Sequence, residues 1–194
     1  LIIFQPELRR ALEQLGRGTL FSRSSNQEDE VTSRVIDELV KSVQYMAKRR
    51  IGALIVLERE TGLGDYMETG TSIQGELSSE LIINIFIPNT PLHDGAIIVR
   101  KNLIMAAACY LPLSENPFIS KELGTRHRAA LGISEATDAL AIIVSEETGQ
   151  VSIAKNGEVH RKLSEEALRE MLEKDLRIPA KANPTFWSRG KGNG

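Results

Sequence analysis

Apolar residues recur at helical spacing in one long stretch of the chain, and this stretch predicts its clearest helix. The side chains that would share one face of that helix are Val31, Val35, Ile36, Leu39, Val40, Val43 and Met46. Ser25 and Glu28 have the spacing of a capping box, so we expect the helix to begin near Ser25. Three basic residues suit the negative end of the helix dipole, and we expect the helix to end near Arg50.

Other apolar stretches are short and rich in β-branched residues, and they predict β-strands. Residues 53–57 and 139–144 are continuous apolar runs, which indicates strands that are covered on both faces. Residues 96–99 and 103–111 flank a short polar turn and predict a hairpin. A second hairpin is predicted between the strand at 139–144 and residues 150–154.

Three further helices are predicted from the residues at their ends, and a fourth is predicted after Thr125. Pro6 and Gly16 suit the start and the end of a helix over residues 6–15. A second helix is expected from about Ser79, in a stretch that ends at Ile87, and a last helix follows a cap at Ser164. Together these elements predict the α/β fold class: a single globular domain with a central twisted mixed β-sheet flanked by helices.

The length of the chain, 194 residues, indicates one domain. We expect residues 1–20 to form a short helix and linker, residues 21–178 to form the main domain, and residues 179–194 to form a flexible tail. No apolar run approaches the roughly 20 residues that a membrane span needs. The chain starts at Leu1, and we expect that a preceding segment has been removed.

Composition narrows the classes of function. The formal net charge of −2 argues against nonspecific nucleic-acid binding, which needs a clear excess of lysine and arginine. An anionic ligand must therefore be held by a local cluster of charges. The single cysteine, Cys109, lies among apolar residues and is expected to be buried and unreactive, and no group of cysteines and histidines has zinc spacing.

The first candidate functional segment is residues 91–96, PLHDGA. Gly95 and Ala96 are small enough to let a ligand approach the backbone. His93 and Asp94 could bind a divalent metal, or Asp94 could accept a hydrogen bond from a sugar hydroxyl. The alternative is an ordinary turn before a strand.

The second candidate segment is residues 124–130, GTRHRAA, where Thr125 is the expected N-cap of a helix. Arg126 and Arg128 would gather at the positive end of that helix, beside its free backbone N–H groups, and this combination binds phosphate. Basic residues in a first helical turn oppose the dipole unless an anion is present. The alternative is a solvated basic face paired with Glu122 or Glu135.

The third candidate segment is residues 145–149, SEETG, which follow a predicted buried strand. A carboxylate at this strand end could hold a metal ion that bridges phosphates. The alternative is an acidic hairpin turn. Residues 62–64, GLG, are not a phosphate loop, because neither the Gly-Lys-Ser/Thr ending nor a following helix is present.

Taken together, the Asp94-Gly95-Ala96 and Arg126-His127-Arg128 motifs resemble the two signature motifs of the diadenylate cyclase family. The similarity runs from about Phe4 to about Arg161, and the long segment 124–130 is the specific part of it. The resemblance implies the fold of that family and an enzyme that condenses two ATP molecules into cyclic di-AMP and two pyrophosphates. It also implies Mg²⁺ or Mn²⁺ as the cofactor.

The resemblance assigns roles to individual residues. It implies that Asp94 contacts the attacking 3′ hydroxyl with help from a metal, and that His93 and Glu147 are further metal ligands. It implies that His127 shapes the phosphate loop and that Tyr110 and Leu111 flank the adenine. Residues implied in catalysis are Asp94, Gly95, Arg126, His127 and Arg128. Residues implied in ATP binding are Asp94, Gly95, Ala96, Tyr110, Leu111, Gly124, Thr125, Arg126, Arg128, Ser145, Glu146 and Glu147.

The opening residues 4–13 resemble the stretch that follows three transmembrane helices in the membrane-bound bacterial type of this family. This implies a soluble domain that faces the cytoplasm and is tethered to the bacterial cell membrane through a segment absent from the chain. Each chain has one copy of each motif and hence one ATP, whereas the product has two equivalent nucleotides, so an active homodimer is expected. The alternatives are a sensor that binds ATP or a cyclic dinucleotide without turnover, and a scaffolding domain whose partner docks on the helix at 31–46.

Overall fold

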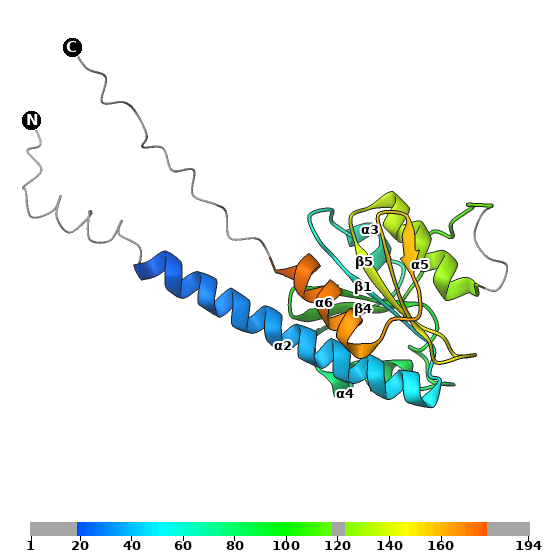
Figure 1. The fold of residues 1–194 in the computed structure, drawn as a ribbon. Coiled ribbons are helices and arrows are strands. Elements are labelled where there is room, and N and C mark those ends of the chain that lie inside the picture. The colour runs from blue at the N-terminus through cyan, green and yellow to red at the C-terminus, as the bar shows by residue number, and fades with distance from the viewer. Residues whose placement is uncertain (1–18, 118–122, 178–194) are drawn as a thin grey trace, which may run out of the picture.

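The computed structural model describes residues 19–117 and 123–177, and these build a seven-stranded sheet with the strand order β2-β4-β3-β1-β5-β6-β7 (Figure 1). β1 and β3 are parallel, whereas every other neighbouring pair is antiparallel, so the sheet is mixed. The strands are β1 (Ala53–Leu57), β2 (Thr71–Glu76), β3 (Ala96–Arg100), β4 (Leu103–Cys109), β5 (Leu140–Val144), β6 (Val151–Lys155) and β7 (Glu158–His160).

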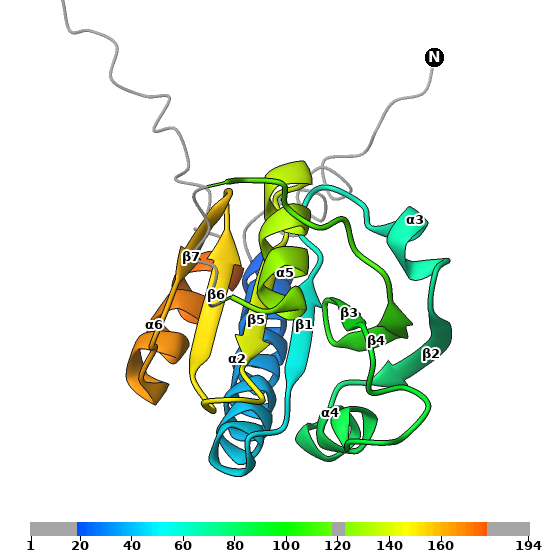
Figure 2. The same ribbon diagram turned by 90° about the vertical axis from the view of Figure 1, so that its right-hand side faces the viewer.

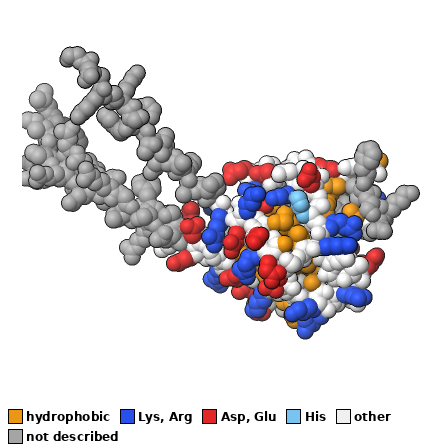
Figure 3. Space-filling view, viewed as in Figure 1, with side chains coloured by type: hydrophobic (Ala, Val, Ile, Leu, Met, Phe, Trp, Pro, Cys, Tyr) orange, Lys and Arg blue, Asp and Glu red, His pale blue; other side chains and the backbone are white. Residues whose placement is uncertain are grey.

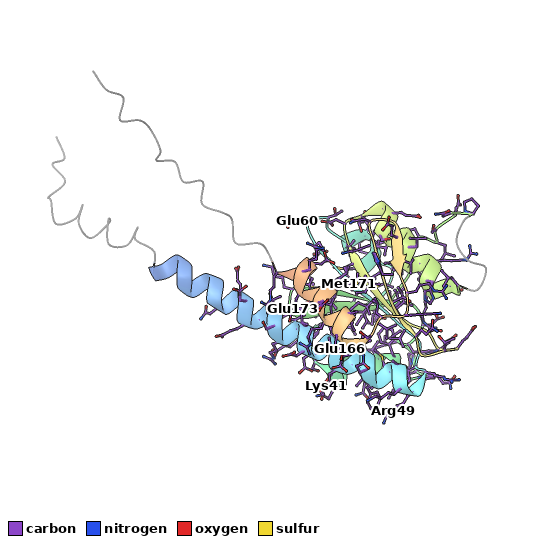
Figure 4. All side chains as sticks on the ribbon, in the orientation of Figure 1. Lys41, Arg49, Glu60, Glu166, Met171 and Glu173 are labelled. Carbon is purple, nitrogen blue, oxygen red and sulfur yellow. The ribbon has the colours of Figure 1, made fainter. Side chains whose placement is uncertain are left out.

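Helices cover both faces of the sheet. The helices are α2 (Thr19–Arg49), α3 (Gly64–Met67), α4 (Ser79–Phe86), α5 (Thr125–Ala136) and α6 (Glu165–Leu176). Figure 2 shows α5 in front of β1, β5 and β6, and α2 behind them. Lys41 on α2 donates a hydrogen bond to Glu80 on α4 at 2.8 Å, and α6 packs beside α2 on the same side (Figure 4).

The central strand β1 explains why its sequence is continuously apolar. Leu54 and Val56 point into the core beneath α5, whereas Ile55 and Leu57 point into the core beneath α2, α4 and α6. Successive side chains of a strand face opposite sides of the sheet, so a strand with a core on each side has no polar position. The sheet therefore holds the segments at its ends between two packed layers.

The connection from α2 to β1 is closely fixed. The backbone N–H of Ile51 donates to the carbonyl of Met46 at 2.9 Å, which closes the end of the helix. Gly149, in the turn between β5 and β6, lies so close to this helix end that a Cβ there would be 2.4 Å from the carbonyl oxygen of Ala47. Residues 50–52 are thus held between α2, β1 and the β5–β6 turn.

Most predicted elements are confirmed: the strands at 53–57, 96–99 and 139–144, both hairpins and the helix that begins at Ser79. The cap at Ser164 is also confirmed, because its hydroxyl accepts a hydrogen bond from the N–H of Ala167 at 3.2 Å. The predicted helix at residues 6–15 and the tail at residues 179–194 lie outside the described residues.

Several predicted boundaries are wrong. α2 begins at Thr19, so Ser25 lies inside the helix and not at its start. The predicted strand at 103–111 ends at Cys109, before a segment that crosses α5. The N-cap of α5 is Gly124, with extended backbone, and Thr125 is already helical. The sequence reading also missed the strands β2 and β7 and the short helix α3.

Acidic and basic side chains are interspersed on the side that carries α2 and α6 (Figure 3), as the small net charge suggests. In the described part of the chain, no helix is both long and apolar enough to cross a membrane.

Candidate active site

A pocket of about 490 Å³ lies at the end of the sheet where β1 and β3 begin and where β4 and β5 end. Four segments line it: residues 93–95 before β3, residues 109–111 with Leu113 after β4, residues 124–127 at the start of α5, and residues 145–147 after β5. Its floor is apolar and comes from Leu54, Ala129 and Ile143. All three candidate segments of the sequence therefore meet in one pocket.

The segment before β3 depends on Gly95. Its φ is +104°, a conformation that favours glycine, and a Cβ there would lie 2.8 Å from the carbonyl oxygen of Cys109. His93 Nδ1 lies 2.6 Å from the carbonyl oxygen of Thr90, and since a carbonyl can only accept, Nδ1 carries the proton. In the neutral ring Nε2 then keeps its lone pair, and the neighbouring Asp94 is exposed to solvent.

The start of α5 gathers positive charge without a side-chain cap. Gly124 offers no capping oxygen, so N–H groups of the first turn remain available to a ligand. Arg126 Nη1 donates to Glu146 Oε2 at 2.6 Å. Arg126 Nε is buried and has no partner among the residues that the structure describes. A buried donor without a partner at a helix N-terminus indicates a place for an anion.

His127 forms another part of this wall. Burial lowers the pKa of its imidazole below the ordinary value of 6.5, and the positive charge of Arg161 lowers it further. The ring is therefore neutral at pH 7, and it adds no positive charge to that of the neighbouring Arg126.

The wall after β4 is apolar, exposed and fastened to α5. The side chains of Tyr110 and Leu113 are 70% and 53% exposed, which is unusual for such large apolar groups and suits a flat ligand ring. The N–H of Ser114 donates to the carbonyl of Arg128 at 3.0 Å, and the Ser114 hydroxyl donates to Glu135 at 2.8 Å. The wall and the arginine-bearing helix are thus positioned together.

The turn after β5 supplies carboxylates. The N–H of Ser145 donates to the carbonyl of Gln150 at 3.0 Å, and the N–H of Gly149 donates to the carbonyl of Ser145 at 2.9 Å. This fixed turn presents Glu146 and Glu147 at the pocket.

His93, Asp94 and Glu147 line the same pocket and offer donors that Mg²⁺ or Mn²⁺ can take. Within residues 19–117 and 123–177, no group of three or more His, Cys, Asp or Glu side chains is gathered as a metal site. The donor set therefore fits a cation that completes its coordination with phosphate oxygens and water, as Mg²⁺ commonly does.

Two of the residues implied by the resemblance do not line the pocket. Ala96 is fully buried in the core beneath α5. The side chain of Arg128 is not part of the lining, although its carbonyl holds the wall through Ser114. The alternative for this segment was a basic face paired with Glu122 or Glu135. Glu135 instead accepts a hydrogen bond from Ser114, and Arg126 pairs with Glu146. Glu122 lies outside the described residues.

Cys109 is buried as predicted, and burial raises its pKa to about 11. It is therefore a neutral thiol and unsuited to nucleophilic chemistry. The sequence did not point to the floor residues Leu54 and Ile143, because their apolar runs are typical of buried core strands. It also did not point to Gly52, which lies against Arg126.

Comparison with known proteins identifies the family. Residues 40–159 match the family described as DAC, DisA bacterial checkpoint controller nucleotide-binding. The match covers more than half of the chain, so the chain belongs to the DAC family.

Two relatives match this chain over nearly its whole length, and a solved structure matches a large part of it. Cyclic di-AMP synthase CdaA of Bacillus subtilis is 65% identical over 197 residues, which span 100% of this chain and 72% of that protein. A diadenylate cyclase of Listeria monocytogenes is 58% identical over 192 residues, or 99% of this chain and 70% of that protein. The crystal structure of a double mutant of DacA from Staphylococcus aureus matches with a TM-score of 0.73 and 57% identity, covering 74% of this chain and 96% of the other.

Proposed function

We propose that the pocket binds ATP and that this chain is a diadenylate cyclase, which joins two ATP molecules into cyclic di-AMP. Relatives that are 65% and 58% identical are named cyclic di-AMP synthase and diadenylate cyclase. The single observation that carries the proposal is the meeting of residues 93–95, 124–127 and 145–147 in one pocket. A carboxylate, an anion site and an exposed apolar wall are the parts that a nucleotide with a reacting sugar hydroxyl requires.

In the proposed reaction a 3′ hydroxyl attacks the α-phosphate of a second ATP. The new bond joins the 3′ oxygen to the α-phosphorus, the bond from that phosphorus to the oxygen that bridges it to the β-phosphate breaks, and pyrophosphate leaves. The same step in the opposite sense closes the ring and releases the second pyrophosphate. Asp94 contacts the hydroxyl and accepts its proton as the bond forms. Arg126 and the N–H groups at the start of α5 hold the triphosphate and stabilise its developing charge. The adenine lies against Tyr110 and Leu111.

Reactions of this class use a divalent metal, and we propose Mg²⁺ or Mn²⁺. His93, Asp94 and Glu147 would hold the ion, which would lower the pKa of the hydroxyl and neutralise phosphate charge. His93 suits this role because its Nδ1 proton is committed to Thr90, so that Nε2 can face a cation.

We also propose that the active species is a homodimer. One chain carries one copy of each candidate motif, whereas the product contains two nucleotides related by a twofold axis. Two pockets that face each other would place each 3′ hydroxyl near the other nucleotide's α-phosphate. Specific activity should then fall on dilution below the dimer dissociation constant, and constant activity would contradict the dimer.

A membrane tether outside this chain is a further proposal. It is supported by the resemblance of residues 4–13 to the stretch that follows membrane helices in the membrane-bound type. A solved structure described as a hypothetical membrane spanning protein from Bacillus cereus matches with a TM-score of 0.64 and 44% identity.

The proposed function is tested by incubating the purified chain with ATP and either metal and identifying products by mass. We expect cyclic di-AMP and pyrophosphate from the wild type. Asp94→Asn should still bind ATP in calorimetric titration but lose cyclisation by more than about 100-fold, because the contact to the hydroxyl is lost. Binding without product from the wild type would instead favour a sensor, and normal cyclisation by Asp94→Asn would remove its assigned role.

A further inference from the structure

Gly52 lies against the Arg126–Glu146 pair at one end of the pocket, although it belongs to none of the three candidate segments. It is buried and directly precedes β1. A Cβ at this position would lie 2.5 Å from Arg126 Nη1, 2.8 Å from Arg126 Cζ and 2.8 Å from Glu146 Oε2. These distances are shorter than side-chain carbons tolerate, so the guanidinium occupies the space that a larger residue would fill.

The backbone at Gly52 has little freedom to retreat. Ile51 is bound to the end of α2 through the carbonyl of Met46, at 2.9 Å, and Ala53 is paired with Val144 in the sheet. The tip of Arg126, by contrast, is the far end of a flexible side chain. A Cβ at position 52 would therefore displace the guanidinium and leave the strand in place.

The requirement at this position is for space and not for an unusual backbone conformation. The φ of Gly52 is outside the left-handed region, whereas those of Gly95, Gly149 and Gly157 are inside it. An alanine at position 52 adds only a methyl group and brings no backbone strain. Any effect of this substitution thus reports on the contact with the ion pair.

We propose that Gly52 is a positioning residue, which fixes where Arg126 presents its guanidinium to the triphosphate. The inference rests on the proposed role of Arg126 in ATP binding. Arg126 is held on one side by Glu146, and its buried Nε has no partner in the described part of the chain. Because charge-assisted contacts to phosphate depend on geometry, a shift of the guanidinium by about 1 Å weakens them strongly.

The test is a double-mutant cycle between Gly52→Ala and Arg126→Ala. Affinity is measured by calorimetry with 3′-deoxy-ATP and Mg²⁺, because this nucleotide lacks the attacking hydroxyl and cannot turn over. Gly52→Ala should weaken binding about tenfold or more in the wild-type background. In the Arg126→Ala background, where the guanidinium is gone, it should change affinity less than about twofold.

Gly62→Ala is the matched control, since a Cβ there has no heavy atom within 4 Å and the φ of Gly62 is not positive. It should leave affinity unchanged. Equal losses from Gly52→Ala in both backgrounds, or no loss in the wild-type background, would overturn the positioning role. An unchanged affinity of Arg126→Ala would instead overturn the role proposed for Arg126, and the positioning proposal with it.

Folding provides a second readout. If the added methyl group destabilises the Gly52→Ala protein, the thermal midpoint should recover in the double variant, because two of the three crowded atoms belong to Arg126 and the third, Glu146 Oε2, ends an exposed side chain that can move aside once its partner is gone. A double variant that is as unstable as Gly52→Ala alone would show that the methyl group collides with the backbone, and this result would contradict the proposal.

Discussion

Each end of β1 carries an arginine–glutamate ion pair, and the two pairs differ in how completely their polar atoms are used. Beyond the carboxyl end, Glu58 accepts hydrogen bonds from Arg100 Nε, from Arg100 Nη2 at 3.0 Å and from the N–H of Leu63 at 2.8 Å. Before the amino end, Arg126 Nη1 donates to Glu146 Oε2 at 2.6 Å, and the buried Nε of Arg126 is without a partner among the described residues.

The exposed fractions of the side chains also distinguish the two pairs. The Glu58 side chain is only 8% exposed and accepts three hydrogen bonds, while its partner Arg100 is 44% exposed, so the buried member of this pair is satisfied. The Glu146 side chain is 62% exposed while Arg126 is 22% exposed, so an exposed carboxylate holds a half-buried cation. A buried carboxylate whose oxygens have donors fixes a loop, whereas a buried guanidinium N–H that has no partner among the described residues is ready for another anion.

The largest effect of a substitution is expected for Arg126→Ala, and it concerns ATP affinity. ATP affinity should fall about 10- to 100-fold, because the variant loses charge-assisted hydrogen bonds to the triphosphate. The free energy of unfolding should change by less than about 1 kcal/mol, since Glu146 remains solvated. Calorimetry and denaturant unfolding of the same preparation measure both quantities.

The control for Arg126 is Arg169→Ala, which removes an ion pair with Asp37 on the surface of α6 and α2. It should leave ATP affinity unchanged. If Arg126→Ala destabilised the fold as strongly as it weakened binding, the distinction between the two ends of β1 would fail.

Arg100→Ala is expected to lower the stability of the fold and to leave ATP affinity nearly unchanged. The free energy of unfolding should fall by about 1–3 kcal/mol, because Glu58 is left nearly buried and short of donors. ATP affinity should change less than about twofold, since this pair lies beyond the opposite end of the strand. The matched control is Arg34→Ala, whose partner Glu76 is 61% exposed, and it should cost less than about 1 kcal/mol. A larger loss from Arg34→Ala than from Arg100→Ala would contradict this account.

The smallest effect is expected in the pH dependence of stability. The hydrogen bond from Arg100 lowers the pKa of Glu58 below its ordinary value of 4.5, although burial opposes the shift. A carboxyl group with a lowered folded-state pKa stabilises the fold above its unfolded pKa, and this contribution is lost as pH falls through the folded value. The stability difference between wild type and Glu58→Gln should therefore shrink below pH 4.5. Denaturant unfolding of both proteins between about pH 3 and about pH 7, in steps of about half a pH unit, measures this difference. A difference that stays constant over this range would contradict the role of Arg100.

The sequence predicted those parts of the fold whose signal is local. The continuous apolar runs of β1 and β5 could be recognised because both faces of each strand are buried. β2 was missed because it is a largely exposed edge strand with an irregular register and a positive φ at Gln74. β7 was missed because it has only three residues.

The parts of the site that are local in the sequence could also be predicted, whereas contacts between distant elements could not. Residues 93–95 and 124–127 carry motifs that can be read along the chain, and the structure brings them together. The pairing of Arg126 with Glu146 could not be read, because it depends on where the end of β5 lies relative to α5. Gly52 was also beyond sequence reasoning, since its importance comes from a side chain that approaches it from another element.

The central claim is that the Asp94 segment and the Arg126 helix start act on one bound triphosphate. The most direct test is a crystal structure of the chain with 3′-deoxy-ATP and Mg²⁺. The account predicts phosphate oxygens within hydrogen-bonding distance of Arg126, a metal ion at Asp94 and the base against Tyr110. A nucleotide bound elsewhere, with no phosphate near Arg126 or Asp94, would contradict it.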